Sequence, residues 1–199
     1  TGIPVRFIND ASAFAIGEAF AGSGKGFKRL ITITLGTGFG SAFMENGVPV
    51  IEREDVPENG CVYHLPYRDG IADEYFSTRW FVSRYQELTG KNAKGVKDIA
   101  DLVDSDKAAK GIFDEFGTNL GTFLSPWFRK FKAEALIAGG SISRAWKIFG
   151  GTFDRALKNE NVNLVSRVSE LKENAALLGG AQLFVDEYWD KMKDVVAQM

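Results

Sequence analysis

The stretch from Arg29 to Gly40 most strongly limits what this chain can fold into. Arg29 to Leu35 alternates and is rich in β-branched side chains, a pattern typical of a strand. The strand runs directly into Gly36-Thr37-Gly38-Phe39-Gly40. Glycine adopts positive φ and has no side chain, so such a turn can bring backbone N–H groups close to a phosphate. The turn lacks the Gly-Lys-Ser/Thr ending of a Walker loop, and it can equally be a tight hairpin connection.

A carboxylate stands near the start of the chain, where an apolar run gives way to a helix-like pattern. Val5 to Ile8 predicts a short buried strand, and Ala11 to Ala21 predicts a helix. Asp10 lies between them. At this place its carboxylate can be the N-cap of the helix, accepting a backbone N–H bond. It can also be a general base that takes a proton from a sugar hydroxyl, and the residue alone leaves both interpretations open.

The order of the remaining elements predicts an α/β domain with a mixed sheet. Ser41 to Ile51 is predicted as a hairpin because Asn46-Gly47 is a strong turn signal, and Cys61 to Leu65 is predicted as a strand. After these, helices alternate with strands. The predicted helices are residues 71–88, 96–103, 108–131, 143–157 and 174–196, the last broken at Gly179-Gly180, and the predicted strands are residues 133–138 and 162–168.

A third glycine-bearing turn, Gly139-Gly140-Ser141, joins a predicted strand to a predicted helix. Small residues at this junction allow a flat ring or a phosphate to come close, and the helix dipole favours anions. An ordinary strand-to-helix turn has the same composition, so the motif is not specific by itself.

Charge and composition exclude several classes of protein. The 24 basic residues are balanced by 26 acidic residues, so nothing favours binding to a nucleic-acid backbone. One cysteine and one histidine exclude an internal disulfide and a zinc site made of Cys and His alone. We therefore expect a cytoplasmic protein, and no apolar run approaches the roughly 20 residues of a membrane span. Because Thr1 is not an initiator Met and a strand is predicted at once, we expect a piece of a larger protein.

The glycine-bearing turns, in this order, resemble the ROK family of sugar kinases and repressors in the actin-like ATPase superfamily. Asn9-Asp10-Ala11 followed by Gly17-Glu18 is similar to the family's catalytic segment, and Leu35 to Gly40 is similar to its second phosphate motif. Gly139 to Ser143 is similar to its adenosine motif, and Leu178 to Ala181 to its closing helix. The resemblance covers nearly the whole chain.

This resemblance implies a ribonuclease-H-like fold with a mixed sheet flanked by helices. Residues 1–28 would carry the catalytic segment and join an N-terminal domain outside the chain, and residues 29–199 would form the C-terminal domain. The implied activity is an ATP-dependent hexose kinase with Mg²⁺, whose ligands lie mostly outside this chain. The implied substrate is a hexose or amino-hexose, and the implied assembly is a homodimer.

The resemblance also implies roles for individual residues. Asp10 would be the catalytic base. The residues with implied ligand contacts are Asn9, His64, Asp73 and Glu74 for the sugar, and Gly36, Thr37, Gly38, Gly139 and Gly140 for ATP.

The chain departs from the family's pattern at two places. Many members bind zinc with a cysteine cluster and the His matched by His64, but Pro66 to Phe76 contains no cysteine. We therefore expect no zinc, and we expect Cys61 and His64 to point to opposite faces of a strand. Cys61 also stands near the place of a sugar-binding Glu of the family, which leaves turnover open.

Two alternatives to a kinase follow from the same resemblance. One is a ROK transcriptional regulator, whose DNA-binding helix-turn-helix would precede Thr1, and only that segment would contact nucleic acid. The other is a sugar-binding domain without turnover. The family's Asp-Gly-Gly-Thr phosphate loop does not occur in this chain, so we expect the isolated 199 residues to have no sugar kinase activity.

Overall fold

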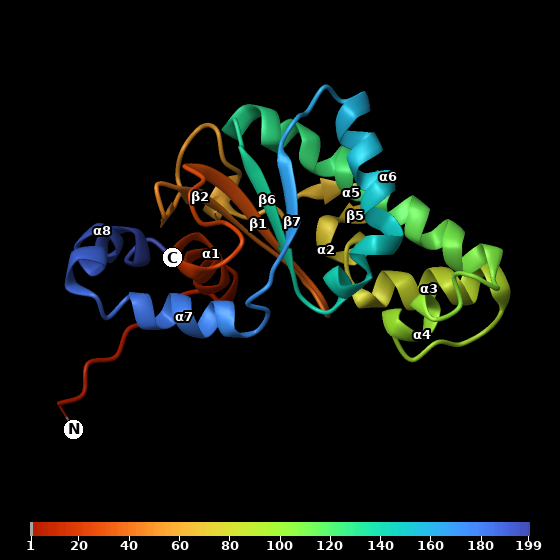
Figure 1. The fold of residues 1–199 in the computed structure, drawn as a ribbon, viewed down its shortest axis with the longest axis horizontal. Helices are drawn as coiled ribbons and strands as arrows, with labels where there is room; N and C mark the ends of the chain where they lie inside the picture. The colour runs from red at the N-terminus through yellow and green to blue at the C-terminus, as the bar shows by residue number, and fades with distance from the viewer. Residues whose placement is uncertain (1) are drawn as a thin grey trace.

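A computed structural model describes residues 2–199 of the chain. Its centre is a five-stranded mixed sheet with the order β3-β2-β1-β6-β7 (Figure 1). The middle strand, β1, pairs antiparallel with β2 and parallel with β6, and β7 pairs parallel with β6. The strands are β1 (Arg29–Leu35), β2 (Phe39–Glu45), β3 (Val48–Pro49), β6 (Ala135–Gly139) and β7 (Val165–Val168), with a separate hairpin of β4 (Pro66–Tyr67) and β5 (Gly70–Ile71).

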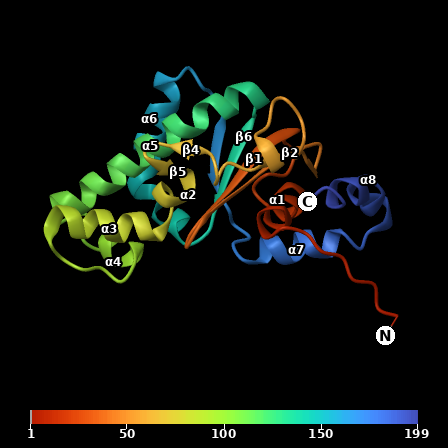
Figure 2. The same cartoon turned by 180° about the vertical axis from the view of Figure 1, so that it is seen from behind.

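Helices cover both faces of the sheet, which confirms the predicted α/β fold with a mixed sheet flanked by helices. In the two opposite views of Figures 1 and 2, α5 and α6 lie on one side of the strands, and α1, α7 and α8 lie on the other. The helices are α1 (Asp10–Ala21), α2 (Ala72–Tyr75), α3 (Thr78–Thr89), α4 (Val96–Ala100), α5 (Lys107–Phe131), α6 (Trp146–Asn159), α7 (Asn174–Gln182) and α8 (Asp186–Val196).

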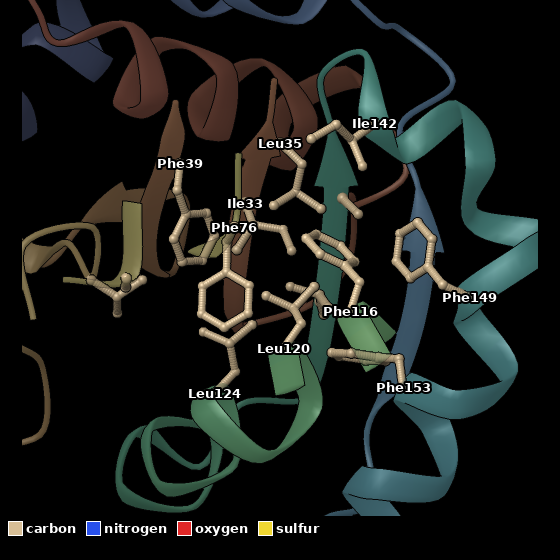
Figure 3. Packing of buried hydrophobic residues seen from close by; sticks show 14 of the residues in the cluster. Ile33, Leu35, Phe39, Phe76, Phe116, Leu120, Leu124, Ile142, Phe149 and Phe153 are labelled. Atoms are coloured by element: carbon tan, nitrogen blue, oxygen red, sulfur yellow. The ribbon is translucent and has the colours of Figure 1, made fainter. Parts of the chain in front are cut away.

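Alternation along β1 divides the core in two. Ile31, Ile33 and Leu35 point into a cluster rich in phenylalanine that also includes Phe116 of α5 and Phe149 of α6 (Figure 3). Leu30 points to the opposite face, into a smaller cluster with residues of α1 and α8. Both faces of the strand are therefore buried, as expected for the central strand of an α/β sheet.

Two predicted strands near the site are wrong. Val5 to Ile8 is not in a strand: it forms part of the extended segment before α1, with Val5 68% and Phe7 81% exposed. Among the described residues, Val5 to Ile8 forms no backbone hydrogen bonds with a neighbouring strand, so its strand-like sequence does not become part of a sheet. Cys61 to Leu65 contains a turn, closed by a bond from the N–H of Leu65 to the carbonyl of Val62 at 3.2 Å. The Tyr63 carbonyl accepts from the N–H of Asp73 in α2 at 2.9 Å, which ties the turn to that helix.

Two predicted helices also differ in where they are interrupted. The helix predicted over residues 71–88 is divided at Phe76 and Ser77, because Thr78 turns to donate both its N–H and its hydroxyl to the carbonyl of Gly36. The last helix runs through Gly179-Gly180 and breaks instead at residues 183–185.

Candidate active site

A cavity of about 750 Å³ lies between the start of α1 and the glycine-rich β1–β2 turn. Its wall includes Asn9 and Asp10, the whole turn from Gly36 to Gly40, and Cys61 with Tyr63 on the far side. Two of the predicted motifs, separated by more than two dozen positions in the sequence, therefore meet at one cavity.

The start of α1 fixes the orientation of Asp10. The N-cap is Asn9, whose Oδ1 accepts from the N–H groups of Ala11 at 3.0 Å and Ser12 at 3.2 Å. The prediction that Asp10 is the N-cap is therefore wrong: Asp10 is the first residue of the helix. Its Oδ1 accepts from the N–H of Ala11 at 2.8 Å, and no residue in 2–199 donates to its Oδ2. One oxygen is held and the other is free to take up a proton.

A second cavity of about 560 Å³ continues from the first. The two share Asp10, Ala11, Thr34 and Gly140, so Asp10 stands where they join. This volume lies in the range of ligand pockets. The rest of its wall comes from α1, from the turn after β6, from α6, from the end of β7 with the loop after it, and from α7. These residues are Phe14, Gly139, Ser143, Arg144, Trp146, Lys147, Val168, Ser169, Lys172, Glu173 and Ala176.

Side chains that do not line the first cavity hold the glycine-rich turn by hydrogen bonds. Asp73 Oδ1 accepts from the N–H of Phe39 at 2.7 Å, and Thr78 donates to the carbonyl of Gly36. Within residues 2–199, the N–H groups of Thr37 and Gly38 donate to no other group. Free N–H groups in a turn of this kind are suited to an anion.

Asp73 and Glu74, predicted to contact sugar, serve the local backbone in this structure. Asp73 holds the glycine-rich turn and lies 3.6 Å from Arg79. Glu74 Oε2 accepts from the N–H of Ile71 at 3.1 Å, just before the start of α2. Neither residue is part of the wall of the two cavities.

Cys61 and His64 lie together: Cys61 Sγ is 3.7 Å from His64 Nδ1. The prediction that they point to opposite faces is wrong, because the segment is a turn and the alternation of a strand does not apply. Cys61 is in the cavity wall and His64 stands behind it. Burial raises the pKa of the Cys61 thiol, and the nearby Glu58 carboxylate raises it further.

Gly139 and Gly140 line the second cavity, but protein contacts explain why they are glycines. A β-carbon on Gly139 would stand 2.3 Å from the ring of Phe14. Gly140 has a φ of 84°, and a β-carbon there would stand 2.3 Å from the carbonyl oxygen of Leu35. The turn thus lies close to α1 and β1, and this close packing shapes the cavity.

Sequence reasoning missed several residues of the second cavity, namely Trp146, Lys147, Lys172 and Glu173. Trp146 and Lys147 could have been found, since a helix that follows a glycine turn presents its first residues to the same side. Lys172 and Glu173 had no such signal, because the contact between α1 and α7 brings them to the cavity.

The acidic residues near the cavities do not form a metal site by themselves. Within residues 2–199, no three His, Cys, Asp or Glu side chains gather as metal ligands would. Asp10 is the only carboxylate in the described wall of the first cavity. Mg²⁺ binds one or two carboxylates together with phosphate oxygens, so this chain offers part of such a ligand set.

Among residues 2–199, no helix is long and apolar enough to cross a membrane.

Comparison with known proteins connects this arrangement to one family. The model of the ROK family matches residues 1–187. A glucokinase from Thermotoga maritima is 28% identical over 212 residues, which cover 92% of this chain and 66% of that protein. An N-acetylgalactosamine kinase from Shewanella is 26% identical and covers 70% of this chain and 51% of its own length. The chain thus spans about two thirds or less of these curated relatives.

Solved structures show the same fold at lower identity. A ROK family glucokinase from Streptomyces griseus, in complex with glucose and AMPPNP, superposes with a TM-score of 0.75 at 24% identity. It covers 92% of this chain and 69% of that one. A ROK family transcriptional regulator, a homologue of the E. coli MLC protein, superposes with a TM-score of 0.77 at 20% identity, over 91% of this chain and 52% of its own.

Proposed function

The chain belongs to the ROK family, and from that premise we propose that it is the C-terminal part of an ATP-dependent hexose kinase. In this proposal residues 1–28 join an N-terminal domain and residues 29–199 form the C-terminal domain. The observation that carries the proposal is the position of Asp10 at the junction of two cavities, with one carboxylate oxygen free. A group at a junction can act on atoms supplied from both sides.

The first cavity is proposed to hold the sugar hydroxyl and the phosphates. Asp10 takes the proton of the hydroxyl as its oxygen attacks phosphorus, a general-base role that typically contributes ~10²–10⁴-fold. The N–H groups of Thr37 and Gly38 are free to bind phosphate oxygens. Asn9 caps α1 through Oδ1, so its amide NH₂ is available to a sugar hydroxyl. His64 does not line the cavity, so we propose that it acts on the sugar through the lining residues that it contacts, Cys61 and Tyr63.

The second cavity is proposed to hold the adenosine part of ATP. Trp146 offers a flat apolar surface, and Lys147 and Lys172 offer positive charge for an anionic ligand. Bound Mg²⁺ would neutralise charge on the phosphates, and its ligands would come mostly from outside the chain.

The substrate is proposed to be a hexose or an amino-hexose, because the named relatives act on glucose and on N-acetylgalactosamine. The family also leads us to propose a homodimer in the cytoplasm. A transcriptional regulator is the second candidate, since one such protein shares the fold. A sugar-binding domain without turnover is the third.

The test is an assay of the full-length protein with Mg-ATP and a panel of hexoses and amino-hexoses. We expect sugar phosphate from at least one substrate. Sugar binding by calorimetry without any product would favour the binding domain. Binding of operator-like DNA in a mobility shift, released by sugar and again without product, would favour the regulator.

A further inference from the structure

Glu18 is a fully buried carboxylate that the proposed reaction does not use. It lies in the C-terminal half of α1 with 0% of its surface exposed. Among residues 2–199 it is the only acidic or basic side chain that is buried to this extent. Burying a carboxylate is unfavourable unless hydrogen bonds replace its water, so its partners need an explanation.

Both oxygens of Glu18 have a donor. Oε2 accepts from the N–H of Ser23 at 2.8 Å, in the loop after α1. Oε1 accepts from the hydroxyl of Ser169, which is 151 positions away in the sequence. Each carboxylate oxygen can accept a hydrogen bond, and each has one donor here. Glu18 therefore joins the end of α1 to the loop after β7.

Ser169 itself lines the second cavity, and its hydrogen bonds continue along the wall. Ser169 Oγ, while donating to Glu18, accepts from the N–H of Lys172 at 2.8 Å. The N–H of Ser169 donates to the carbonyl of Ala138 in β6 at 2.9 Å, which anchors the loop to the sheet. Lys172 and the following Glu173 both line the second cavity.

Lys172 has a backbone conformation that needs support. Its φ of 54° lies in the left-handed region, which is uncommon for a residue with a side chain. Two hydrogen bonds hold this residue: its N–H donates to Ser169 Oγ at 2.8 Å, and its carbonyl accepts from the N–H of Ala175 at 3.2 Å. Loss of the bond to Ser169 would allow the loop to move Lys172 and Glu173 away from the cavity.

We propose that Glu18 is a positioning residue for the nucleotide cavity. Through Ser169 it holds the loop from Ser169 to Glu173 in the shape that forms one wall. Glu18 lines neither cavity, so its effect on a ligand passes through Ser169 and Lys172. The inference rests on the proposed function only in the identity of the ligand, an adenine nucleotide.

The chemistry of the site makes Glu18→Gln an informative variant. The amide keeps the volume but has one acceptor oxygen in place of two. If its oxygen faces Ser23, its NH₂ faces Ser169, and the serine hydroxyl loses its acceptor. If the amide is turned the other way, two donors face each other at Ser23. In the first arrangement the NH₂ can donate to the serine oxygen instead, and the hydroxyl proton is left without an acceptor. In the second arrangement one hydrogen bond is lost, so both arrangements weaken the link to the loop.

The experiment compares Glu18→Gln and Ser169→Ala with Glu170→Gln, an exposed glutamate of the same loop. Hydrogen–deuterium exchange of the Lys172 amide and binding of AMPPNP are measured on the chain. In the first two variants we expect about tenfold faster exchange at Lys172 and about tenfold weaker AMPPNP binding, as for the loss of a hydrogen bond to a charged group. Glu170→Gln should match the wild type in both.

Exchange at Ile33, in the core of β1, reports global unfolding and should stay unchanged. Ser169→Ala keeps the bond between Glu18 and Ser23, so it remains a test where Glu18→Gln fails to fold. Because Ser169 itself lines the cavity, the exchange of the Lys172 amide is the deciding readout in this variant. Unchanged exchange at Lys172, or faster exchange with unchanged AMPPNP binding, would overturn the proposal. If the wild-type chain binds no AMPPNP, the proposed function fails at this cavity, and the Lys172 exchange still decides whether Glu18 holds the loop.

Discussion

Gly179 lies directly against the carbonyl oxygen of Ala13: a β-carbon added to Gly179 would stand 1.8 Å from that oxygen. Gly17 makes the reciprocal contact, since a β-carbon there would stand 1.9 Å from the carbonyl oxygen of Ala175. The two glycines let α1 and α7 approach at backbone distance. Helix α1 begins at Asp10, and α7 begins directly after Lys172 and Glu173 in the wall of the second cavity. The contact between the two helices therefore fixes the position of Asp10 relative to that wall.

We expect Gly179→Ala to destabilise the fold strongly and Gly180→Ala to leave it intact. The added methyl group at Gly179 would overlap backbone, which cannot move aside, and we expect a loss of about 3 kcal/mol or more. Apart from its two chain neighbours and the nearby backbone of its own helix, no atom lies within 4 Å of a carbon added at Gly180. The change should therefore be neutral or stabilising by up to ~1 kcal/mol from helix propensity. Urea unfolding of the two variants measures both values. Equal losses would show that the helices do not meet as described.

The same glycine pair shows why the sequence predicted some elements and not others. The strand Arg29–Leu35 was predicted at its observed bounds, because alternation and β-branched residues coincide there. A helix break was predicted at Gly179-Gly180 because glycine weakens helices. Contact with α1 outweighs that local preference, and no local pattern reports a contact with residues about 165 positions away.

Cys61 is expected to react slowly with iodoacetamide at neutral pH. Burial and the charge of Glu58 raise the pKa of its thiol above the ordinary 9.0, and only the thiolate reacts. The rate of alkylation, followed by mass spectrometry from pH 6 to 11, should therefore have its midpoint above 9.0. A bound sugar should slow the reaction, since Cys61 is in the cavity wall. A midpoint below 9.0 would contradict the role of burial and of Glu58.

The candidate site was predicted in part for a related reason. Asp10 and the glycine-rich turn have local signatures, and the structure brings them to one cavity. The position of Cys61 beside His64 depends on a turn that is hydrogen-bonded to α2. A strand or helix pattern in the sequence does not predict such a tertiary contact. The use of Asp73 to hold the turn likewise depends on tertiary packing.

Acid should weaken the fold through a charged cluster at the end of β2. Glu45 accepts from Arg29 at 2.5 Å and from Arg53 at 2.6 Å. The hydrogen bond from Arg53, followed by that from Arg29, holds the pKa of Glu45 below its ordinary 4.5, and Arg53 holds the pKa of Asp55 below its ordinary 3.8. A lowered folded-state pKa stabilises the fold above the unfolded value, and this contribution is lost as the pH falls through the folded value.

The free energy of unfolding should therefore be insensitive to these groups above about pH 5 and should fall below it. Urea titrations between pH 2.5 and 7 measure this dependence. Glu45→Gln should be less stable than the wild type at pH 7 and should show a shallower fall in acid. Glu54→Gln, an exposed glutamate in the same region, is the control and should follow the wild-type curve. Parallel curves for all three proteins would contradict the role of the cluster.

We still expect no structural zinc, although the argument from a strand is wrong. Cys61 and His64 are close enough to face one ion, but structural zinc takes four ligands, and in residues 2–199 no third candidate joins them. The segment that follows is held by aromatic packing: Tyr67 lies among Tyr75, Phe76 and Phe123 with ring centroids about 5 Å apart. Elemental analysis after dialysis should find far less than one zinc per chain, and chelation should not change thermal stability.

The most direct test of the proposed chemistry is Asp10→Asn in the full-length protein. The amide oxygen can still accept from the N–H of Ala11, so α1 should begin as before. What is lost is the free oxygen that takes up the proton. We expect kcat to fall by ~10²-fold or more with little change in the KM for sugar, because a base acts in the transition state and contributes little to substrate binding.

The matched control for this variant is Asp104→Asn, an exposed aspartate in the turn after α4 and outside both cavities. It should retain the wild-type kcat and KM. Calorimetry with sugar alone separates binding from turnover and should give similar affinities for all three proteins. A kcat for Asp10→Asn within a few-fold of the wild type would mean that the free oxygen at the junction is not the base. Asp10 would then serve only to support the first turn of α1, and another group would have to accept the proton.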